Sequence, residues 1–283
     1  MSCYTPIHVA IDKKSIVTDR KIRYTQQVGC GHCLGCRYEQ SRHWAVRILH
    51  EEQMHKRASF VTLTYSDFNV PRNGTLVPAH LSTFIKNLRH EVDDRISFFG
   101  AGEYGDINRR PHYHLAIFGP PFEKRFQRQD LYYSPTIEDV WGKGRTDIGP
   151  ITPASAAYVA GYVMKKQLAR DNHNHLVRVN PLTGELFEVA PEFSRMSLNP
   201  ALGRTWIQRY WRDVYPRDAI VVQGKEYKPP RYYDKWMDDN LPLIMDYVRD
   251  VRFENMEDLD PYTLDAMHEA HRARHDLFTR RDL

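Results

Sequence analysis

The 283-residue sequence is long enough to bury a substantial core, in one large domain or two small ones. No apolar run approaches the length needed to span a bilayer, and the N-terminus has no signal-peptide core, so we expect a cytoplasmic protein. The net charge of +4 is uneven: residues 1–170 are basic, which suits a nucleic-acid backbone as partner, and residues 171–283 are acidic.

All four cysteines lie near the N-terminus, at Cys3, Cys30, Cys33 and Cys36. In a reducing compartment such a group indicates metal binding rather than disulfide bonds. Four thiolates complete a tetrahedral site, so we expect structural Zn²⁺ on these side chains. Two alternatives stay open: His32 could replace one sulfur, and three cysteines at this spacing also suit an iron–sulfur cluster.

The chain then alternates helix-like and strand-like segments. Residues 37–57 carry apolar side chains at helical spacing, and residues 59–66 alternate apolar and hydroxyl side chains, as a strand does. Residues 78–92 predict a second helix. The segments 96–105 and 112–119 are strand-like and joined by a turn-prone stretch, so we expect them to pair antiparallel.

The second half of the chain begins with a short helix near 136–142 and a strand near 146–151. Pro153 suits the first turn of a helix that continues to residue 170. Residues 171–200 are polar and turn-rich, and we expect them to be flexible. They are followed by a helix over 204–217, a hairpin over 219–233 with its turn at Gln223–Gly224, and an acidic, helical remainder from Trp236.

These elements predict an α+β fold, a central antiparallel sheet with helices packed on one face. We divide the chain into three segments. Residues 1–58 form a cysteine-rich element with an amphipathic helix, residues 59–170 form the core, and residues 171–283 form a C-terminal extension with an acidic tail.

Two histidines stand out on the second core strand. His112 and His114 flank one residue, so their side chains project to the same face of the sheet and can hold one ion. Glu103 would lie across the ladder on the neighbouring strand. A carboxylate with two imidazoles suits Mn²⁺, or Mg²⁺ as a harder ion. The alternatives are ordinary surface histidines, or a catalytic zinc site that would need a third ligand of another kind.

Two tyrosines stand out on the helix that follows. Tyr158 and Tyr162 are four residues apart and share one helical face, away from the apolar stripe, and Lys165 and Lys166 follow on the same side. Exposed phenols beside ammonium groups suit a transesterification of a phosphodiester, in which tyrosine attacks phosphorus. The alternative is that both tyrosines only pack against a neighbouring strand.

Taken in order, FVTLTY, GEYGDINRRPHYHLAIFG and YVAGYVMKK resemble the three motifs of the HUH endonucleases, the initiators of rolling-circle replication. The third motif resembles the two-tyrosine form of the phiX-type phage A proteins. From about residue 3 to 240 the chain is similar to the replication initiators of gokushoviruses, which are microviruses of bacteria. The segments that carry this likeness are Cys3 with CGHCLGCR, HWAVRILHE, WGKGRTDIG, AAYVAGYVMKK and PPRYYDKW.

The resemblance implies a role for each candidate residue. His112 and His114 become ligands of a catalytic Mn²⁺ or Mg²⁺, with Glu103 as the third. Tyr158 and Tyr162 become alternating nucleophiles, and the family's pattern of a lysine three residues after a tyrosine falls on Lys165. That family also has a lysine between the tyrosines, where this chain has Gly161. Tyr158 therefore lacks such a partner, and we expect Tyr162 to make the first cut.

The implied function is initiation of phage replication in the host bacterial cytoplasm. The initiator would nick the origin of the double-stranded replicative form, leave a 5′-phosphotyrosine, prime synthesis from the free 3′-hydroxyl and rejoin the displaced strand. The sequence has no G-x-x-x-x-G-K-[ST] loop, so we expect no nucleotide cofactor and rely on a host helicase and polymerase. The alternatives are a plasmid or transposon nickase and a non-enzymatic zinc-containing DNA-binding protein.

Overall fold

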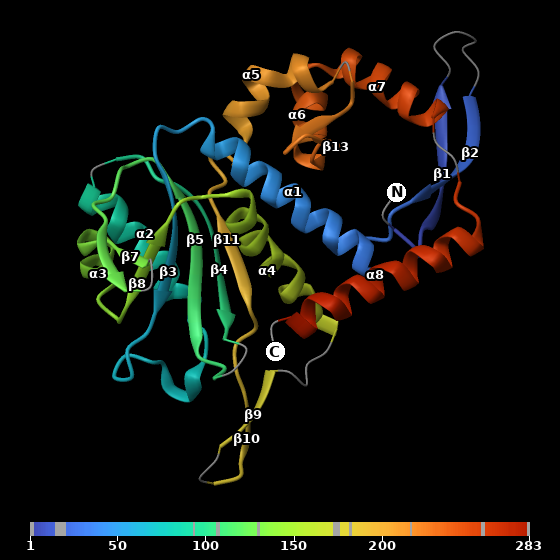
Figure 1. Cartoon of the computed structure of the whole chain (residues 1–283). Coiled ribbons are helices and arrows are strands. Elements are labelled where there is room, and N and C mark those ends of the chain that lie inside the picture. The colour runs from blue at the N-terminus through green and yellow to red at the C-terminus, as the bar shows by residue number, and fades with distance from the viewer. Residues whose placement is uncertain are drawn as a thin grey trace. The chain divides into compact units, whose positions relative to one another are not determined.

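The computed structural model describes residues 3–14, 21–92, 94–105, 108–128, 131–171, 176–180, 183–215, 217–255 and 258–281. Eight α-helices and four β-sheets lie in these ranges (Figure 1). The chain forms two compact units, one of Met1–Gln40 with Leu243–Leu283 and one of Ser41–Pro242. The division of the chain at residues 58 and 170 stays a prediction. Among the described helices, none combines the length and the apolar character of a membrane span.

The larger unit is built on a seven-stranded sheet in which every pairing is antiparallel. Its strands, in spatial order, are β11 (Phe193–Met196), β4 (Ser97–Tyr104), β5 (Pro111–Phe118), β3 (Ala58–Thr64), β8 (Thr146–Gly149), β7 (Leu131–Tyr133) and β6 (Arg125–Arg128). The predicted antiparallel pairing of the two core strands is confirmed as β4 with β5. Both strands are almost wholly buried, which explains their near-continuous apolar sequence.

Helices cover both faces of this sheet, so the prediction of helices on one face is wrong. One face packs against α2 (Pro78–Val92) and α3 (Pro135–Trp141), and the other against α4 (Pro153–Asp171) and the end of α1 (Leu34–Glu52). The reason lies in β4 and β5, whose successive side chains are apolar in both directions. Each face therefore has to be removed from water.

The polar segment that we expected to be flexible contains structure in its described part. Strands β9 (Val177–Val179) and β10 (Leu186–Glu188) form a hairpin, and β11 adds an edge to the central sheet. The predicted hairpin after α5 (Arg204–Val214) is confirmed as β12 (Ile220–Val222) and β13 (Lys225–Tyr227). Gln223 and Gly224 have φ of 50° and 74°, as its two-residue turn requires. The hairpin is shorter than expected because α6 (Arg231–Asn240) begins directly after two prolines.

The smaller unit brings together both ends of the sequence. It contains the hairpin of β1 (Ile7–Lys14) and β2 (Lys21–Val28), the four cysteines, most of α7 (Pro242–Glu254), and α8 (Pro261–Arg281). Tyr4 stacks on His268 of α8 with ring centroids 4.4 Å apart, and Gln27 exchanges hydrogen bonds with the backbone of Leu259. The helical character predicted for the C-terminal remainder is confirmed.

Candidate metal centre and tyrosine helix

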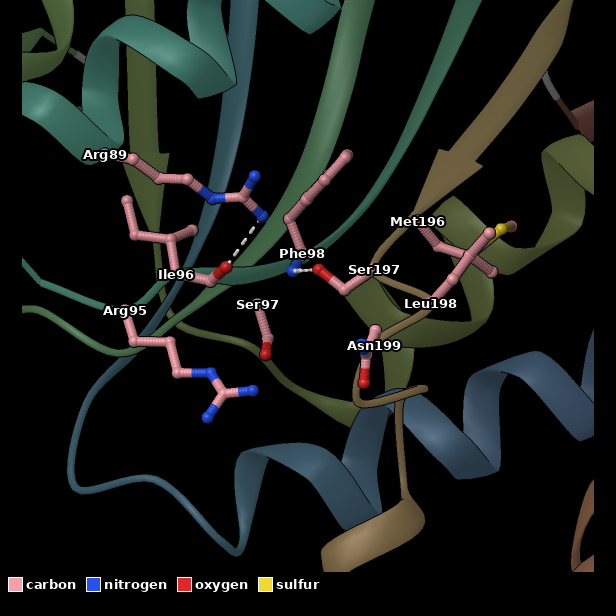
Figure 2. A pocket seen from close by; sticks show the side chains of 9 residues that line it. All are labelled: Arg89, Arg95, Ile96, Ser97, Phe98, Met196, Ser197, Leu198 and Asn199. Carbon is pink, nitrogen blue, oxygen red and sulfur yellow. Dashed lines mark hydrogen bonds between the residues drawn. The ribbon is translucent and has the colours of Figure 1, made fainter.

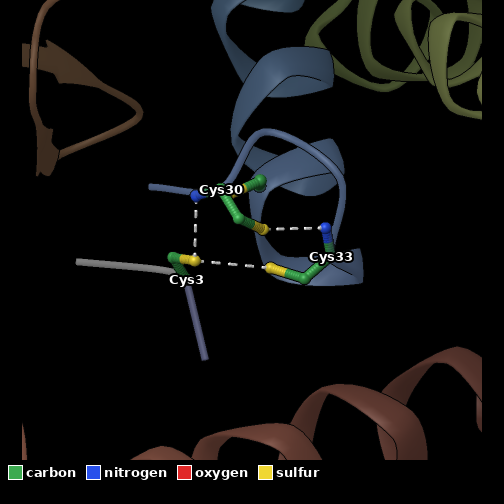
Figure 3. A group of neighbouring side chains, drawn as sticks. Cys3, Cys30 and Cys33 are labelled. Carbon is green, nitrogen blue, oxygen red and sulfur yellow. Dashed lines mark hydrogen bonds between the residues drawn. The ribbon is translucent and has the colours of Figure 1, made fainter. Parts of the chain in front are cut away.

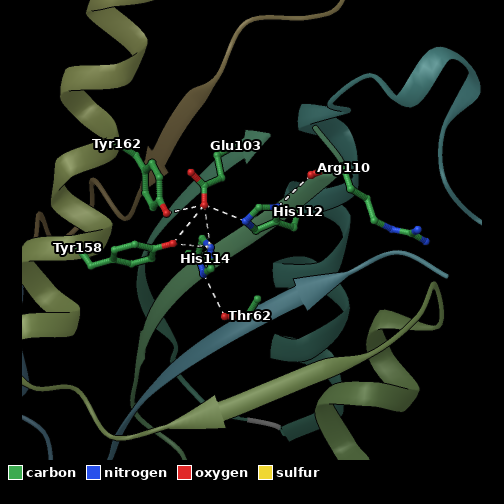
Figure 4. A network of polar contacts seen from close by, with 7 residues as sticks. All are labelled: Thr62, Glu103, Arg110, His112, His114, Tyr158 and Tyr162. Atoms are coloured by element: carbon green, nitrogen blue, oxygen red, sulfur yellow. Dashed lines mark hydrogen bonds and ion pairs between the residues drawn. The ribbon is translucent and has the colours of Figure 1, made fainter. Parts of the chain in front are cut away.

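The β4–β5 ladder brings Glu103 and the two histidines together. Glu103 lies directly opposite His112, and His114 follows two residues later on the same face. Oε1 of Glu103 is 2.8 Å from Nε2 of His112 and 3.0 Å from Nε2 of His114 (Figure 4). The three side chains offer donor atoms that all lie within 4.8 Å of one another. This is the arrangement that the spacing of the residues predicted.

Hydrogen bonds on the outer side fix both imidazole rings. Nδ1 of His112 donates to the carbonyl oxygen of Arg110 at 3.0 Å, and Nδ1 of His114 is 3.0 Å from the hydroxyl oxygen of Thr62 on β3. Because a carbonyl oxygen only accepts, Nδ1 of His112 carries a proton, and the neutral ring turns its Nε2 lone pair toward Glu103. A lone pair and a carboxylate oxygen at this distance need a proton or a cation between them. The donor set therefore fits a divalent cation.

The two tyrosines of α4 reach the same carboxylate. The Tyr158 hydroxyl is 3.3 Å from Oε1 of Glu103 and 3.5 Å from Nε2 of His114, and the Tyr162 hydroxyl donates to Oε1 of Glu103 (Figure 4). The Tyr162 ring stacks on the His114 ring, with centroids 5.5 Å apart and planes 2° from parallel. The predicted sharing of one helical face by these residues is confirmed.

The expectation that both phenols are exposed is wrong for one of them. Tyr158 is 51% exposed, whereas Tyr162 is 3% exposed. At 3.6 residues per turn Tyr162 points only about 60° away from Val159, so it lies beside the apolar stripe and not opposite to it. The stripe includes the small side chains Ala156 and Ala160, which let the helix approach the sheet closely. Burial, and after it the negative charge of Glu103, raises the pKa of Tyr162.

Lys165 cannot be placed against this site. Its backbone belongs to α4, but its side chain lies outside the described residues, as do those of Val163 and Lys166. Its role stays a prediction.

Thr62 and the Arg110 carbonyl were not among the predicted site residues. A signal for Thr62 was present, since it is a hydroxyl residue in the alternating strand FVTLTY. Its partner could not be known before the register of β3 against β5, which sets Thr62 opposite His114.

The four cysteines form a second group of metal donors. Their sulfur atoms lie within 4.8 Å of one another, and Sγ of Cys3 and Cys33 are 3.7 Å apart (Figure 3). Sulfurs bound to one tetrahedral Zn²⁺ at about 2.3 Å would be about 3.8 Å apart. Backbone N–H groups support the cluster, since Cys30 donates to Sγ of Cys3 and Cys33 donates to Sγ of Cys30. His32 contributes its backbone N–H to Sγ of Cys30, while the donor group itself consists of the four sulfurs.

The acidity of Cys30 fits a metal ligand. Burial acts to raise the pKa of this thiol, but hydrogen bonds from the Thr5 hydroxyl and from the N–H groups of Cys33 and His32 outweigh it and lower the pKa to about 6. A thiolate at Cys30 is therefore present at neutral pH.

A cavity of about 440 Å³ lies elsewhere in the larger unit (Figure 2). Arg89, Arg95, Ser97 and Asn199 are among the residues that line it. Ser97 is the first residue of β4 and Glu103 the seventh, so the cavity is roughly 20 Å along the strand from the candidate metal centre. The candidate centre is thus not in this cavity. It lies under α4, where the exposed side of Tyr158 opens to solvent.

Comparison with known proteins gives consistent matches. The sequence profile of the family described as replication-associated protein ORF2 matches residues 58–167, a range that includes the candidate metal ligands and both tyrosines. The replication-associated protein ORF2 of Spiroplasma virus 4 is 31% identical over 266 residues, covering 86% of this chain and 76% of the relative. The replication-associated protein VP4 of Bdellovibrio phage phiMH2K is 28% identical over 278 residues, covering 91% and 84%. ORF4 of Chlamydia phage 1, also named as a replication-associated protein, is 28% identical over 218 residues, covering 72% and 52%. No solved structure matches the chain.

Proposed function

Because this chain belongs to the family of phage replication-associated proteins, we propose that it is the metal-dependent nickase that starts rolling-circle replication at the phage origin. The observation that carries the proposal is the convergence of two phenols on a carboxylate that also contacts two imidazoles. This is the arrangement expected of an HUH endonuclease. All three relatives named above are virus or phage proteins, which favours a phage initiator over a plasmid or transposon nickase.

Glu103, His112 and His114 would hold Mn²⁺ or Mg²⁺ and leave positions open for phosphate oxygens. Bound there, the cation would polarise a non-bridging oxygen of the scissile phosphate. Arg110 and Thr62 keep the imidazoles oriented so that both Nε2 atoms face the ion.

The nucleophile is a phenolic oxygen of α4. As it bonds to phosphorus the phenol loses its proton, the bond from phosphorus to the 3′ oxygen breaks, and that oxygen takes up a proton. The products are a 5′-phosphotyrosine and a free 3′-hydroxyl that primes the host polymerase. A second tyrosine cuts after one round, and the released 3′-hydroxyl attacks the first phosphotyrosine to close a circle. The phosphotyrosine conserves the bond, so no ATP is needed.

Two tyrosines side by side allow this alternation. Tyr158 and Tyr162 have ring centroids 5.1 Å apart, so both can reach one phosphate position. We retain the expectation that Tyr162 makes the first cut, with Lys165 stabilising the charge that develops on phosphate.

Zn²⁺ on the four cysteines would hold the N-terminal segment in place. The separation of the Cys3 and Cys33 sulfurs supports a single tetrahedral ion over an iron–sulfur cluster, because the iron and sulfide atoms of a cluster hold its cysteines further apart. We further propose that the protein acts in the host bacterial cytoplasm with a host helicase.

The test is covalent trapping of DNA. Labelled single-stranded oligonucleotides that tile the viral genome are incubated with the full chain and Mn²⁺, and adducts are resolved on a denaturing gel. We expect one oligonucleotide to give an adduct that survives Tyr158→Phe, disappears in Tyr162→Phe and is unaffected by Tyr247→Phe, a matched change at an exposed tyrosine of α7. If no adduct forms with any divalent metal, the non-enzymatic DNA-binding alternative is favoured instead.

A further inference from the structure

Phe68 is the starting observation, because it is 100% exposed in the loop that follows β3. An apolar ring held wholly in water gains nothing for the fold, and single exposed aromatics are common enough to need no explanation by themselves. What distinguishes Phe68 is its place. The end of β3 pairs with the start of β5, where Thr64 lies opposite His112, so the loop emerges at the end of the sheet that carries a candidate metal ligand.

Hydrogen bonds connect this loop to the candidate metal centre through Arg110. The carbonyl oxygen of Arg110 accepts from His112, and its guanidinium donates to the carbonyl oxygen of Tyr65 and to Oδ1 of Asp67, both at 2.7 Å. Asp67 directly precedes Phe68. One residue therefore fixes both an imidazole of the site and the loop that presents the exposed ring.

The loop is also fixed internally. The N–H groups of Asn69 and Val70 donate to the carbonyl oxygen of Ser66, and the Asn69 side chain donates to the Ser66 hydroxyl. Val70 packs against the core on the far side of Phe68. A ring held on such a turn is pre-organised, so a flat ligand that stacks on it loses little conformational entropy of the loop.

Basic residues surround the base of the loop. The N–H of Thr64 donates to the carbonyl oxygen of Arg145, and that of Ser66 donates to the carbonyl oxygen of Lys143. These pairings bring a guanidinium and an ammonium group, together with Arg110, to the same end of the sheet. A fixed aromatic ring beside cationic side chains is the combination that binds single-stranded nucleic acid, in which bases stack and phosphates pair.

We propose that Phe68 stacks on an unpaired base next to the scissile phosphate and so positions single-stranded origin DNA over the metal centre. The inference rests on the proposed function for the identity of the scissile phosphate. The stacking itself requires only that the protein binds single-stranded DNA.

The test is binding without catalysis. The full chain is titrated against a fluorescein-labelled, 20-nucleotide single-stranded thymidine oligomer in EDTA, and anisotropy gives the affinity. We expect Phe68→Ala to weaken binding about tenfold, the loss typical of one stacked base. Phe126→Ala is the matched control, because Phe126 is a 63% exposed phenylalanine on β6, at the other edge of the sheet. It should bind as the native chain does.

A second variant tests contact directly. Phe68→Trp should retain affinity, and its added emission should be quenched when the oligomer binds. Unchanged affinity of Phe68→Ala, or an unquenched tryptophan, would overturn the proposal and point to a protein partner for this ring. Failure here is separable from failure of the nickase: loss of binding in Phe68→Ala with no adduct under any metal would sink the nickase alone.

Discussion

Thr62 offers a test of the metal centre that leaves all three proposed ligands in place. Its hydroxyl oxygen is 3.0 Å from Nδ1 of His114, and the β3–β5 register sets the two residues opposite each other. Thr62→Val keeps the branched shape that suits a strand but removes the hydrogen-bond partner. Since the His114 side chain is only 8% exposed, water has little access to replace the hydroxyl.

The expected loss follows from this geometry. Removing the partner of a metal-bound imidazole lowers metal affinity by about 10- to 100-fold, or about 1.4 to 2.8 kcal/mol. We expect the lower part of this range, because the Arg110 carbonyl still orients His112 and Glu103 is untouched. The stability of the fold should fall by only about 1 kcal/mol, the usual contribution of one hydrogen bond.

Isothermal titration with Mn²⁺ measures the effect. Thr62→Ser restores a hydroxyl and should recover most of the affinity. Thr64→Val makes the same chemical change two residues along the strand, where the described structure has no hydrogen bond from the side chain to either imidazole. If Thr62→Val bound Mn²⁺ like the native chain, or Thr64→Val were equally weakened, the orienting role of Thr62 would be refuted.

Three further predictions concern stability and the cysteine group. Gly203 has φ of 76° and a Cβ there would lie 2.6 Å from the Tyr233 hydroxyl oxygen, whereas Gly224 has φ of 74° with nothing within 4 Å. In urea unfolding we expect Gly203→Ala to lose about 3 kcal/mol and Gly224→Ala about 1 kcal/mol, and equal losses would contradict the packing argument. Burial lowers the pKa of His50 from 6.5 to about 3, so the unfolded chain binds more protons between these values. The stability of the fold should therefore fall as pH drops below 6.5, by about 1 kcal/mol per pH unit, and His50→Gln should reduce this slope; an unchanged slope would refute the assignment. Cys36→Ser should lower both the zinc content and the Tm, and a full complement of zinc in that variant would exclude a four-cysteine site.

The local order of the site could be predicted from the sequence because it depends on short periods. A step of two residues from His112 to His114 in a strand, and of four from Tyr158 to Tyr162 in a helix, fixes which side chains share a face. Glu103 follows from a single hairpin. These relations involve neighbours along the chain and need no knowledge of the tertiary fold.

What could not be predicted depends on how elements pack. Burial of Tyr162 required knowing how closely α4 approaches the sheet, and the second helical layer required knowing that β4 and β5 are central strands. Strand β11 joins the sheet beside β4 although some ninety residues separate their sequences, and its four residues carry no signal of their own. The exposure of Phe68 likewise contradicts its apolar character and is visible only in the structure.

The central claim is that a divalent cation on Glu103, His112 and His114 faces the phenols of α4. It can be measured by ¹⁹F NMR of the chain with all 17 tyrosines fluorinated, with Tyr158→Phe and Tyr162→Phe to assign the two signals. Paramagnetic Mn²⁺ should broaden these two resonances first, and His112→Ala with His114→Ala should abolish the effect. If both signals stayed sharp at saturating Mn²⁺, the metal would lie away from the tyrosines and the account of strand cleavage would be contradicted.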